Sequence, residues 1–338
     1  MKVLIATAIY PTRENPAFGS FVKTQVDALL QAGVEIDLFV LQGRNRKLMY
    51  PLSVFKLRQR LRADRSIDLV HAHYSYVGLV GRMQRQAPLV VTYHGSDILG
   101  SPRENGQPSP SDPLVIKMGQ WLGRHADAVI VQSREMAAQF DRAIVHILPH
   151  EVDLDLFRPL DRAEARSALG LASDKKYLLF AANPQIAVKR YPLAKDVADY
   201  LRQRDPAIEL IVVYKEPQPR LVQYMNACDA LLFTSFQEGS PNIVKQALAC
   251  NLPLVSTDVG DVREMVGDAT LSYLCAPDVT QFAEKVGEIL RVGGRSNGRQ
   301  KVLHLARPLV AQRLVAVYQE VLQRSAARAK VSLTPDAK

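Results

Sequence analysis

The sequence predicts an α/β protein built from two doubly wound units, each a parallel sheet covered by helices on both faces. Strand-like and helix-like stretches alternate along the first half of the chain, an order that is typical of parallel sheets. The alternation pauses in a turn-rich piece between Pro149 and Pro159 and then starts again. The chain has 338 residues, which suits two domains of roughly 150 residues each.

The first unit is predicted from apolar, β-rich runs with helical stretches between them. The first run, "KVLIATAIY", ends at Pro11 and leads to a helix at residues 21–32. The second run leads to a basic helix, and the third to a short Gly-rich helix. A long loop and the helical stretch 114–126 follow the fourth run. The runs lie at residues 2–10, 34–41, 68–74, 88–95, 128–133 and 144–149.

The second unit repeats this order. Helices at residues 193–204 and 221–226 follow its first two runs, and a third helix follows the break "EGSPN". Residues 306–328 form one amphipathic helix, and the tail 329–338 is polar. The runs lie at residues 176–182, 208–214, 230–235, 253–258 and 269–275.

Composition indicates a globular protein of the cytoplasm. Hydrophobic residues make up 47% and charged residues 23% of the chain. No run of about 18 apolar residues that would span a bilayer occurs, and the start "MKVLIATAIYP" lacks the apolar region and cleavage site of a signal peptide. The cysteines, Cys228, Cys250 and Cys275, are odd in number and lie in apolar surroundings, which fits buried free thiols in a reducing compartment.

The charge balance indicates anionic partners. The net charge is +9, but net charge alone does not separate nucleic acid, lipid headgroups and phosphorylated metabolites. Eight basic residues face a single acid between Arg44 and Arg65. Residues 54–62 are either an amphipathic helix that rests on an anionic membrane or a solvated surface helix. If the helix rests on a membrane, Phe55, Leu57 and Leu61 enter the headgroup layer, and the basic side chains contact anionic lipid. These side chains are Lys56, Arg58, Arg60 and Arg62.

One carboxylate stands at the break after a buried strand. Glu238 follows the run "ALLFTS" and precedes the helix "IVKQALA", with Gln246 eight residues further on. In doubly wound sheets ligands bind at the carboxyl ends of strands, and the free N–H groups at a helix start favour negative charge. A diphosphate suits this position, and Glu238 and Gln246 would reach the hydroxyls of a sugar and of a ribose on either side of it.

The segment "EGSPNIVKQALACNLPLVSTDVGDVREMV" resembles the donor-site signature of the retaining GT-B glycosyltransferases of family four, a Glu-x7-Glu pair followed by a small-residue helix and a strand. The resemblance covers most of the chain, through "PAFGSFVKTQVDALLQAGVEIDLFV", "HAHY", "VTYHGSD", "AVIVQS" and "ILPHEVDLDLFRP". It implies two Rossmann-like domains that face across a cleft. Residues 1–155 would bind the acceptor and residues 156–305 the nucleotide-sugar donor, with helix 306–328 packing back on the first domain.

The resemblance also implies roles for individual residues. His94 and Glu238 would lie beside the transferred sugar, and Lys189 would neutralise the leaving diphosphate, so these three are the candidate catalytic residues. Gly19 and Ser20 resemble the family's glycine turn, and an ordinary turn is the alternative. Lys215 lies where a base pocket would be. The backbone of the break and its helix would meet the sugar and phosphate at Gly239, Ser240, Asn242, Ile243 and Val244.

The sequence departs from the family pattern at three places. Gln246 replaces the second glutamate, which exchanges a charge-assisted hydrogen bond for a neutral one. Asn183 stands near the position of the family's arginine, and Arg190, next to Lys189, is a substitute source of that charge. His150-Glu151 replaces Asn-Gly at the hinge, so either Glu151 is strained or the turn differs.

The function that follows is transfer of a sugar, with retention, from a UDP- or GDP-type donor to a hydroxyl of a lipid-linked or saccharide acceptor in cell-envelope polysaccharide or glycolipid synthesis. No cofactor, metal or nucleic acid is expected, and the membrane would be a peripheral partner. The alternatives are a nucleotide-sugar-binding protein with little transferase activity and a sugar-nucleotide epimerase. His71 and His73 are expected to serve packing, and residues 100–113 form either an acceptor loop or a surface insertion.

Overall fold

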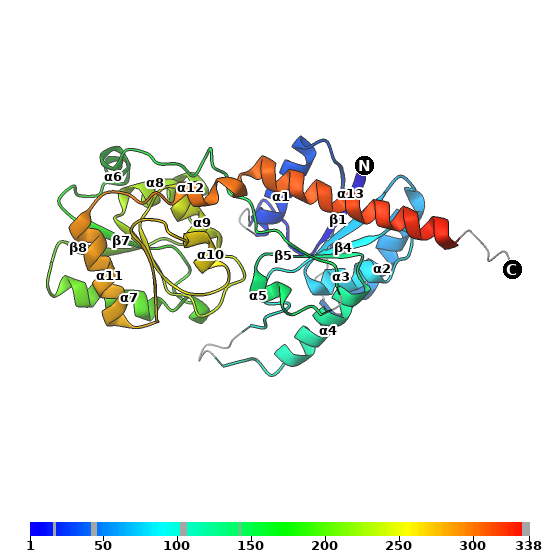
Figure 1. Ribbon diagram of the computed structural model, residues 1–338, viewed down its shortest axis with the longest axis horizontal. Helices are drawn as coiled ribbons and strands as arrows, with labels where there is room; N and C mark the ends of the chain where they lie inside the picture. The colour runs from blue at the N-terminus through cyan, green and yellow to red at the C-terminus, as the bar shows by residue number, and fades with distance from the viewer. Residues whose placement is uncertain (16–17, 42–45, 102–106, 142, 333–338) are drawn as a thin grey trace. The chain divides into compact units, whose positions relative to one another are not determined.

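The computed structural model of the protein describes residues 1–15, 18–41, 46–101, 107–141 and 143–332 (Figure 1). It has two compact units. The first contains Met1–Ser101, Pro110–His150 and the chain from Arg307, and the second is built around Glu151–Ala306. The division falls between His150 and Glu151, close to the predicted end of the first domain at residue 155.

The first unit has a six-stranded parallel sheet in the order β2-β1-β3-β4-β5-β6. The order reverses direction between β1 and β3, which makes their carboxyl ends the switch point of this sheet. The strands are β1 (Lys2–Thr7), β2 (Glu35–Val40), β3 (Leu69–His73), β4 (Leu89–Thr92), β5 (Ala128–Val131) and β6 (Val145–Ile147).

Alternate residues of each strand face different helices. Val3 and Ile5 pack against α1 (Ser20–Gln31) and α13 (Arg307–Ser332), which lie side by side in Figure 1. Leu4 and Ala6 pack against the helices of the opposite face. Because both faces are covered, the strands are apolar throughout, as the sequence predicts. The helices of the opposite face are α2 (Arg46–Ala63), α3 (Ser75–Arg82), α4 (Asp112–His125) and the short α5 (Arg134–Ala137).

The second unit has a five-stranded parallel sheet in the order β11-β10-β9-β7-β8, with its switch point between β7 and β9. Two doubly wound parallel sheets confirm the predicted fold class. The strands are β7 (Lys176–Phe180), β8 (Ile208–Val212), β9 (Ala230–Phe233), β10 (Leu254–Thr257) and β11 (Ser272–Cys275).

Helices cover both faces of this sheet. On one face lie α7 (Tyr191–Arg202) and α11 (Val279–Val292). The opposite face carries α8 (Gln218–Ala227), α9 (Asn242–Ala249), α10 (Val262–Val266) and α12 (Arg299–Val302). The remaining elements are α6 (Arg162–Leu169), η1 (Ala187–Lys189) and η2 (Leu303–Leu305).

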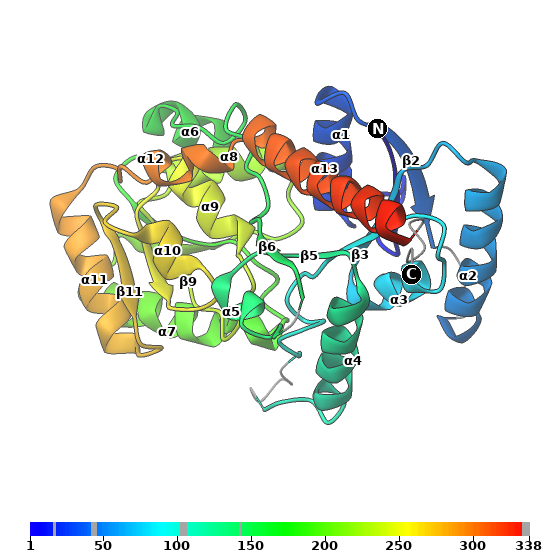
Figure 2. The same cartoon turned by 45° about the vertical axis from the view of Figure 1, so that its right-hand side comes forward.

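Helix α2 corrects one prediction. Leu57 and Leu61 are 0% and 2% exposed and pack in the core of the first unit, so they do not enter a headgroup layer. Arg58 Nε donates to the carbonyl of Met83 at 2.8 Å, and Arg60 Nε donates to Asp37 on β2 at 2.8 Å. Figure 2 shows α2 beside this strand. Of the residues that we predicted to face lipid, four attach the helix to its own unit instead: Leu57, Arg58, Arg60 and Leu61.

Two predicted segments lie partly outside the described residues, at positions 102–106 of the loop 100–113 and 333–338 of the tail. Residues 44 and 45 of the basic segment lie outside them as well. In the described part of the chain, none of the helices combines the length and the apolar composition that crossing a bilayer requires.

Candidate active site

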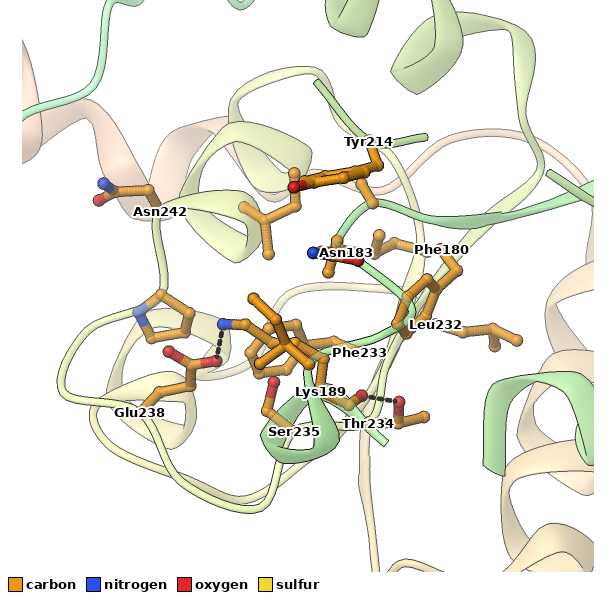
Figure 3. A pocket seen from close by; sticks show the side chains of 16 residues that line it. Phe180, Asn183, Lys189, Tyr214, Leu232, Phe233, Thr234, Ser235, Glu238 and Asn242 are labelled. Carbon is orange, nitrogen blue, oxygen red and sulfur yellow. Dashed lines mark hydrogen bonds and ion pairs between the residues drawn. The ribbon is translucent and has the colours of Figure 1, made fainter. Parts of the chain in front are cut away.

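A cavity of about 310 Å³ lies at the switch point of the second unit, and we call it the switch-point cavity. The carboxyl ends of β7 and β9 form its floor, as expected for ligand sites of doubly wound sheets. Figure 3 shows its lining side chains. They are Phe180, Ala181, Ala182, Asn183, Ile186, Lys189, Tyr214, Leu231, Leu232, Phe233, Thr234, Ser235, Glu238, Pro241, Asn242 and Ile243.

Lys189 and Glu238 form an ion pair in this cavity, with Nζ and Oε1 2.5 Å apart (Figure 3). Lys189 ends the short helix η1, and Glu238 lies in the loop after β9. The hydroxyl of Thr234 donates to the carbonyls of Lys189 and Arg190, at 2.8 and 3.1 Å, and fixes this turn against β9. The sequence placed both charged residues correctly after their strands, and the structure adds that they neutralise each other.

The loop that carries Glu238 rests on the turn after β10. Ser240 Oγ donates to Asp261 at 2.5 Å. Gly260 has φ of +57°, and a Cβ there would come within 2.7 Å of the Glu238 carbonyl oxygen. Only glycine lets the two segments approach so closely. The turn after β10 therefore fixes the position of the loop from Glu238 to Ser240.

Lys245 supports the same loop from inside. This side chain is 0% exposed, and its Nζ lies 3.3 Å from Asn242 Oδ1. Burial lowers the pKa of Lys245 to about 8, while the charges of Asp261 and Glu151 oppose that shift. Burial raises the pKa of Asp261. The helix α9 thus has a buried cation among two acids at the base of the Glu238 loop.

The backbone conformation of Glu151 shows which of the two alternatives for the hinge is correct. It is not among the non-glycine residues with positive φ in the described chain, so the turn differs from the left-handed one that Asn-Gly favours. Its carboxylate interacts electrostatically with Lys245. The departure at position 151 therefore goes together with a buried lysine on α9.

Of four other residues predicted to bind the donor, Asn183 lines the switch-point cavity and Lys215, Val244 and Gln246 do not. Asn183 lines the cavity and its Oδ1 accepts from the backbone N–H of Gln185. Lys215 does not line it, but its Nζ lies 5.0 Å from the ring centroid of Tyr214, which does. Val244 is 0% exposed in the core. Gln246 is half-buried on α9, one turn after Asn242 and on the same side of the helix.

The switch point of the first unit contains Gly19 and a row of histidines. Gly19 has φ of +69°, and a Cβ there would lie 2.6 Å from the carbonyl carbon of Ile9. The turn before Ser20, the first residue of α1, therefore requires glycine for its own packing, which an ordinary turn and a ligand-binding turn would share. Nearby, His73 Nδ1 lies 3.1 Å from His94 Nε2, and His94 Nδ1 lies 3.2 Å from His150 Nε2.

The histidine row uses both ring nitrogens of His94. Burial lowers the pKa of His94 well below its usual value and that of His73 to about 3, so both are neutral near pH 7. His73 Nε2 is buried without a hydrogen-bond partner. Leaving a lone pair rather than an N–H there puts the protons on Nδ1 of His73 and of His94. The sequence marked His94 but not this network.

His71 belongs to the core of the first unit. Its ring nitrogens lie 2.6 Å from the hydroxyls of Tyr318 and of Thr92, and the side chain is 0% exposed. Among the described residues, no group of three or more His, Cys, Asp or Glu side chains is arranged to hold a metal ion.

Comparison with known proteins identifies the family. Residues 7–156 match the profile described as Glycosyltransferase Family 4, and residues 177–291 match that described as Glycosyl transferases group 1. The chain is therefore a GT-B-like glycosyltransferase whose residues 7–156 match family four. This GT-B protein is 29% identical over 267 residues to the D-inositol 3-phosphate glycosyltransferase of Mycobacterium marinum, a match that covers 68% of the chain and 57% of that relative. The Mycobacterium tuberculosis protein of the same name (strain H37Ra) is 28% identical, with 69% and 56% covered. The chain spans little more than half the length of these curated relatives.

Solved structures share the fold of this GT-B protein. Sucrose-phosphate synthase of Thermosynechococcus elongatus has a TM-score of 0.75 at 19% identity, over 96% of this chain and all 100% of that one. HepE of Anabaena, solved with UDP and glucose, has a TM-score of 0.63 at 17% identity, over 98% and 100%. At these identities the likeness supports the architecture rather than a substrate.

Some lining residues of the switch-point cavity were missed in the sequence. Tyr214, Thr234 and Ser235 all lie at or just beyond strand ends, so strand position alone would have marked them. Lys245 falls one residue after Val244 in an apolar helix, and a charge among buried positions was the available signal.

Proposed function

We propose that this GT-B protein transfers a sugar, with retention of anomeric configuration, from a nucleoside-diphosphate donor to an acceptor hydroxyl. The observation that carries the proposal is the convergence of Lys189 and Glu238 in the switch-point cavity. One cation and one carboxylate at strand ends suit a diphosphate and the hydroxyls of a sugar. Structures of the related HepE contain UDP and UDP-glucose, which supports a nucleotide-sugar donor.

Lys189 is the proposed electrostatic catalyst. A partly exposed ion pair contributes about 0.2–1 kcal/mol, so a diphosphate that offers charge-assisted hydrogen bonds of roughly 1.5–3 kcal/mol outcompetes Glu238 for the ammonium group. Glu238 is then released toward the sugar hydroxyls. Stabilising the charge that develops on the leaving diphosphate lowers the barrier, and no divalent ion is needed for it.

The proposed reaction exchanges one bond at the anomeric carbon. The bond to the diphosphate oxygen breaks, a bond to the acceptor oxygen forms on the same face, and the acceptor proton passes to the departing diphosphate. Glu238 is assigned to the sugar hydroxyls rather than to the anomeric carbon, so the proposal includes no covalent glycosyl-enzyme intermediate. Acceptor binding is assigned to the first unit, in which His94 is the proposed catalytic residue.

The test is nucleoside-diphosphate release from a panel of UDP-, GDP- and dTDP-sugars, with lipid-linked and saccharide acceptors from cell-envelope glycans. We expect acceptor-dependent release that persists in EDTA, and a product whose anomeric configuration by NMR matches the donor. Inversion, or complete loss of activity in EDTA, would contradict the mechanism.

The second candidate is a nucleotide-sugar-binding protein with little transfer. Gln246 and Asn183 favour it, because the switch-point cavity then has Lys189 as its lining cation where the family pattern has two. Calorimetry separates the two: tight binding of one donor with no release for any acceptor would support binding alone.

We also propose that the protein is cytoplasmic and rests on the inner face of the membrane through the outer side of α2. Phe55 is 68% and Leu52 57% exposed, and Lys56 and Arg62 lie on the same side of the helix. This patch, Leu52-Phe55-Lys56-Arg62, differs from the set predicted from the sequence, because Leu57 and Leu61 of that set are buried.

A further inference from the structure

A second cavity, of about 430 Å³, lies at the carboxyl ends of β9, β10 and β11, and we call it the edge cavity. It shares a single lining residue, Ser235, with the switch-point cavity, so it is a separate space. Its volume is in the range of small-molecule sites. The lining residues are Arg190, Ser235, Phe236, Thr257, Asp258, Val259, Arg263, Leu274, Cys275, Ala276 and Pro277.

A strained turn directs two consecutive cations into different cavities. Arg190 has φ of 50° and ψ of 48°, the left-handed conformation, which costs a non-glycine residue about 1–2 kcal/mol. The hydroxyl of Thr234 holds the carbonyls on both sides of the turn. Lys189 consequently lines the switch-point cavity and Arg190 the edge cavity. Strain of this kind persists where surrounding contacts enforce it, and it is concentrated at functional sites.

The guanidinium of Arg190 is available to an anion. It lies over the ring of Phe236, 4.2 Å from the centroid. No acidic side chain of the described chain is within ion-pair distance of it, and partial burial lowers its pKa without a carboxylate to oppose the shift. Stacking engages the flat face of a guanidinium and leaves its edge N–H groups for a carboxylate or phosphate.

The rest of the edge cavity suits an apolar body attached to that anion. Asp258 and Arg263 pair with each other, so Arg190 supplies the uncompensated charge of the lining. Phe236, Val259, Leu274 and Pro277 present apolar surface. Phe236 is 42% exposed, so part of its ring surface can pack against a ligand.

We propose that the edge cavity is a second ligand site of this protein, for a small molecule that joins a phosphate or carboxylate to an apolar ring. The oxyanion binds the edge of Arg190, and the ring packs on Phe236 and Leu274. This site works independently of the donor in the switch-point cavity, so it is testable whether or not the proposed transfer is correct. It also reassigns Arg190, which does not line the cavity of Lys189.

Cys275 provides a readout that needs no activity. It lines the edge cavity and is half-buried, whereas Cys228 and Cys250 are 0% exposed. N-ethylmaleimide should therefore label the full chain first at Cys275, and intact mass spectrometry follows the rate. We expect millimolar phenyl phosphate or phenylacetate to slow labelling at least fivefold, and benzyl alcohol, which lacks the anion, to have little effect. The more protective of the two anions identifies the oxyanion.

Two variants of Arg190 and one matched control complete the experiment. Arg190→Gln removes the charge, and Arg190→Gly does so while relieving the positive φ, so the fold is retained in at least the second. We expect protection to disappear in both and to remain in Lys189→Gln. Equal protection in the Arg190 variants, equal protection by benzyl alcohol, or protection by UDP but by neither aryl anion would each overturn the proposal.

Discussion

Glu238 and a bound diphosphate compete for one ammonium group, that of Lys189. We therefore expect Glu238→Gln to bind UDP more tightly by about threefold, because a carboxylate beside the phosphates is removed and Lys189 is released. Lys189→Ala should weaken UDP binding at least tenfold, which is roughly 1.4 kcal/mol. Turnover should fall at least tenfold in both. Titration calorimetry and release kinetics measure these effects, and unchanged values in both variants would remove the proposed site.

Residues with local signals were predictable, and residues defined by distant partners were not. Glu238 and Lys189 each follow an apolar strand run, so their places at the sheet edge could be inferred. The ion pair between them depends on how Gly260 and Thr234 position the two loops. The sequence pattern around Glu238 and Lys189 does not contain that information. His94 was marked by resemblance, but its neighbours His73 and His150 come from other segments.

At the scale of elements, helix α9 rests on a charge balance between Lys245 and two acids. Lys245→Met leaves Glu151 and Asp261 without their cation, so we expect a loss of about 3 kcal/mol in unfolding free energy. Lys245→Met with Glu151→Gln should recover at least half of it. Urea unfolding of the two single variants and the double variant measures the coupling between Lys245 and Glu151. If the change in unfolding free energy of the double variant equals the sum of the two single changes, the two residues are not coupled.

The same variant should have a predictable pH dependence. The pKa of Asp261 is already raised in the folded protein, and removing Lys245 raises it further. A carboxyl with a raised folded pKa binds more protons folded than unfolded, so its charged form costs stability as pH rises. The deficit of Lys245→Met should thus be smaller at pH 5 than at pH 8.

Helix α2 carries the membrane prediction. We expect the protein to co-sediment with anionic vesicles at low salt, to be released at high salt, and to ignore zwitterionic vesicles. The triple variant Phe55→Ser, Lys56→Gln and Arg62→Gln should abolish sedimentation. Arg60→Gln is the control, because Asp37 already neutralises that guanidinium. Wild-type protein that stays in the supernatant would make α2 a solvated face and favour a soluble acceptor.

For the whole molecule, the chain returns to its first unit after completing the second. Leu314 of α13 is 0% exposed among residues of α1 and the first sheet. Leu314→Ala should cost about 2–5 kcal/mol of unfolding free energy, like any large core truncation. Leu309, 43% exposed on the same helix, is the matched control, and its alanine variant should stay within about 0.5 kcal/mol. Equal effects in urea unfolding would show that α13 is not part of that core.

The fold was the most predictable level because parallel strands buried on both faces are continuous apolar runs. "KYLLF" and "ALLF" match β7 and β9 closely. Helix α11 was missed, although Asp278 caps it by accepting from the N–H of Gln281 and Phe282, Val286 and Ile289 recur at helical spacing. The order of the strands, which creates both switch points, follows from tertiary packing and has no local signal.

The hydroxyl of Thr234 affects both cavities of the second unit. Its oxygen contacts neither charged group, yet it holds the peptide carbonyls from which the ammonium of Lys189 and the guanidinium of Arg190 diverge. Valine has the same shape without the hydroxyl, so an exchange there would leave the packing intact and release the turn. A geneticist would see a pleiotropic allele: one substitution that alters the responses to two unrelated molecules at once.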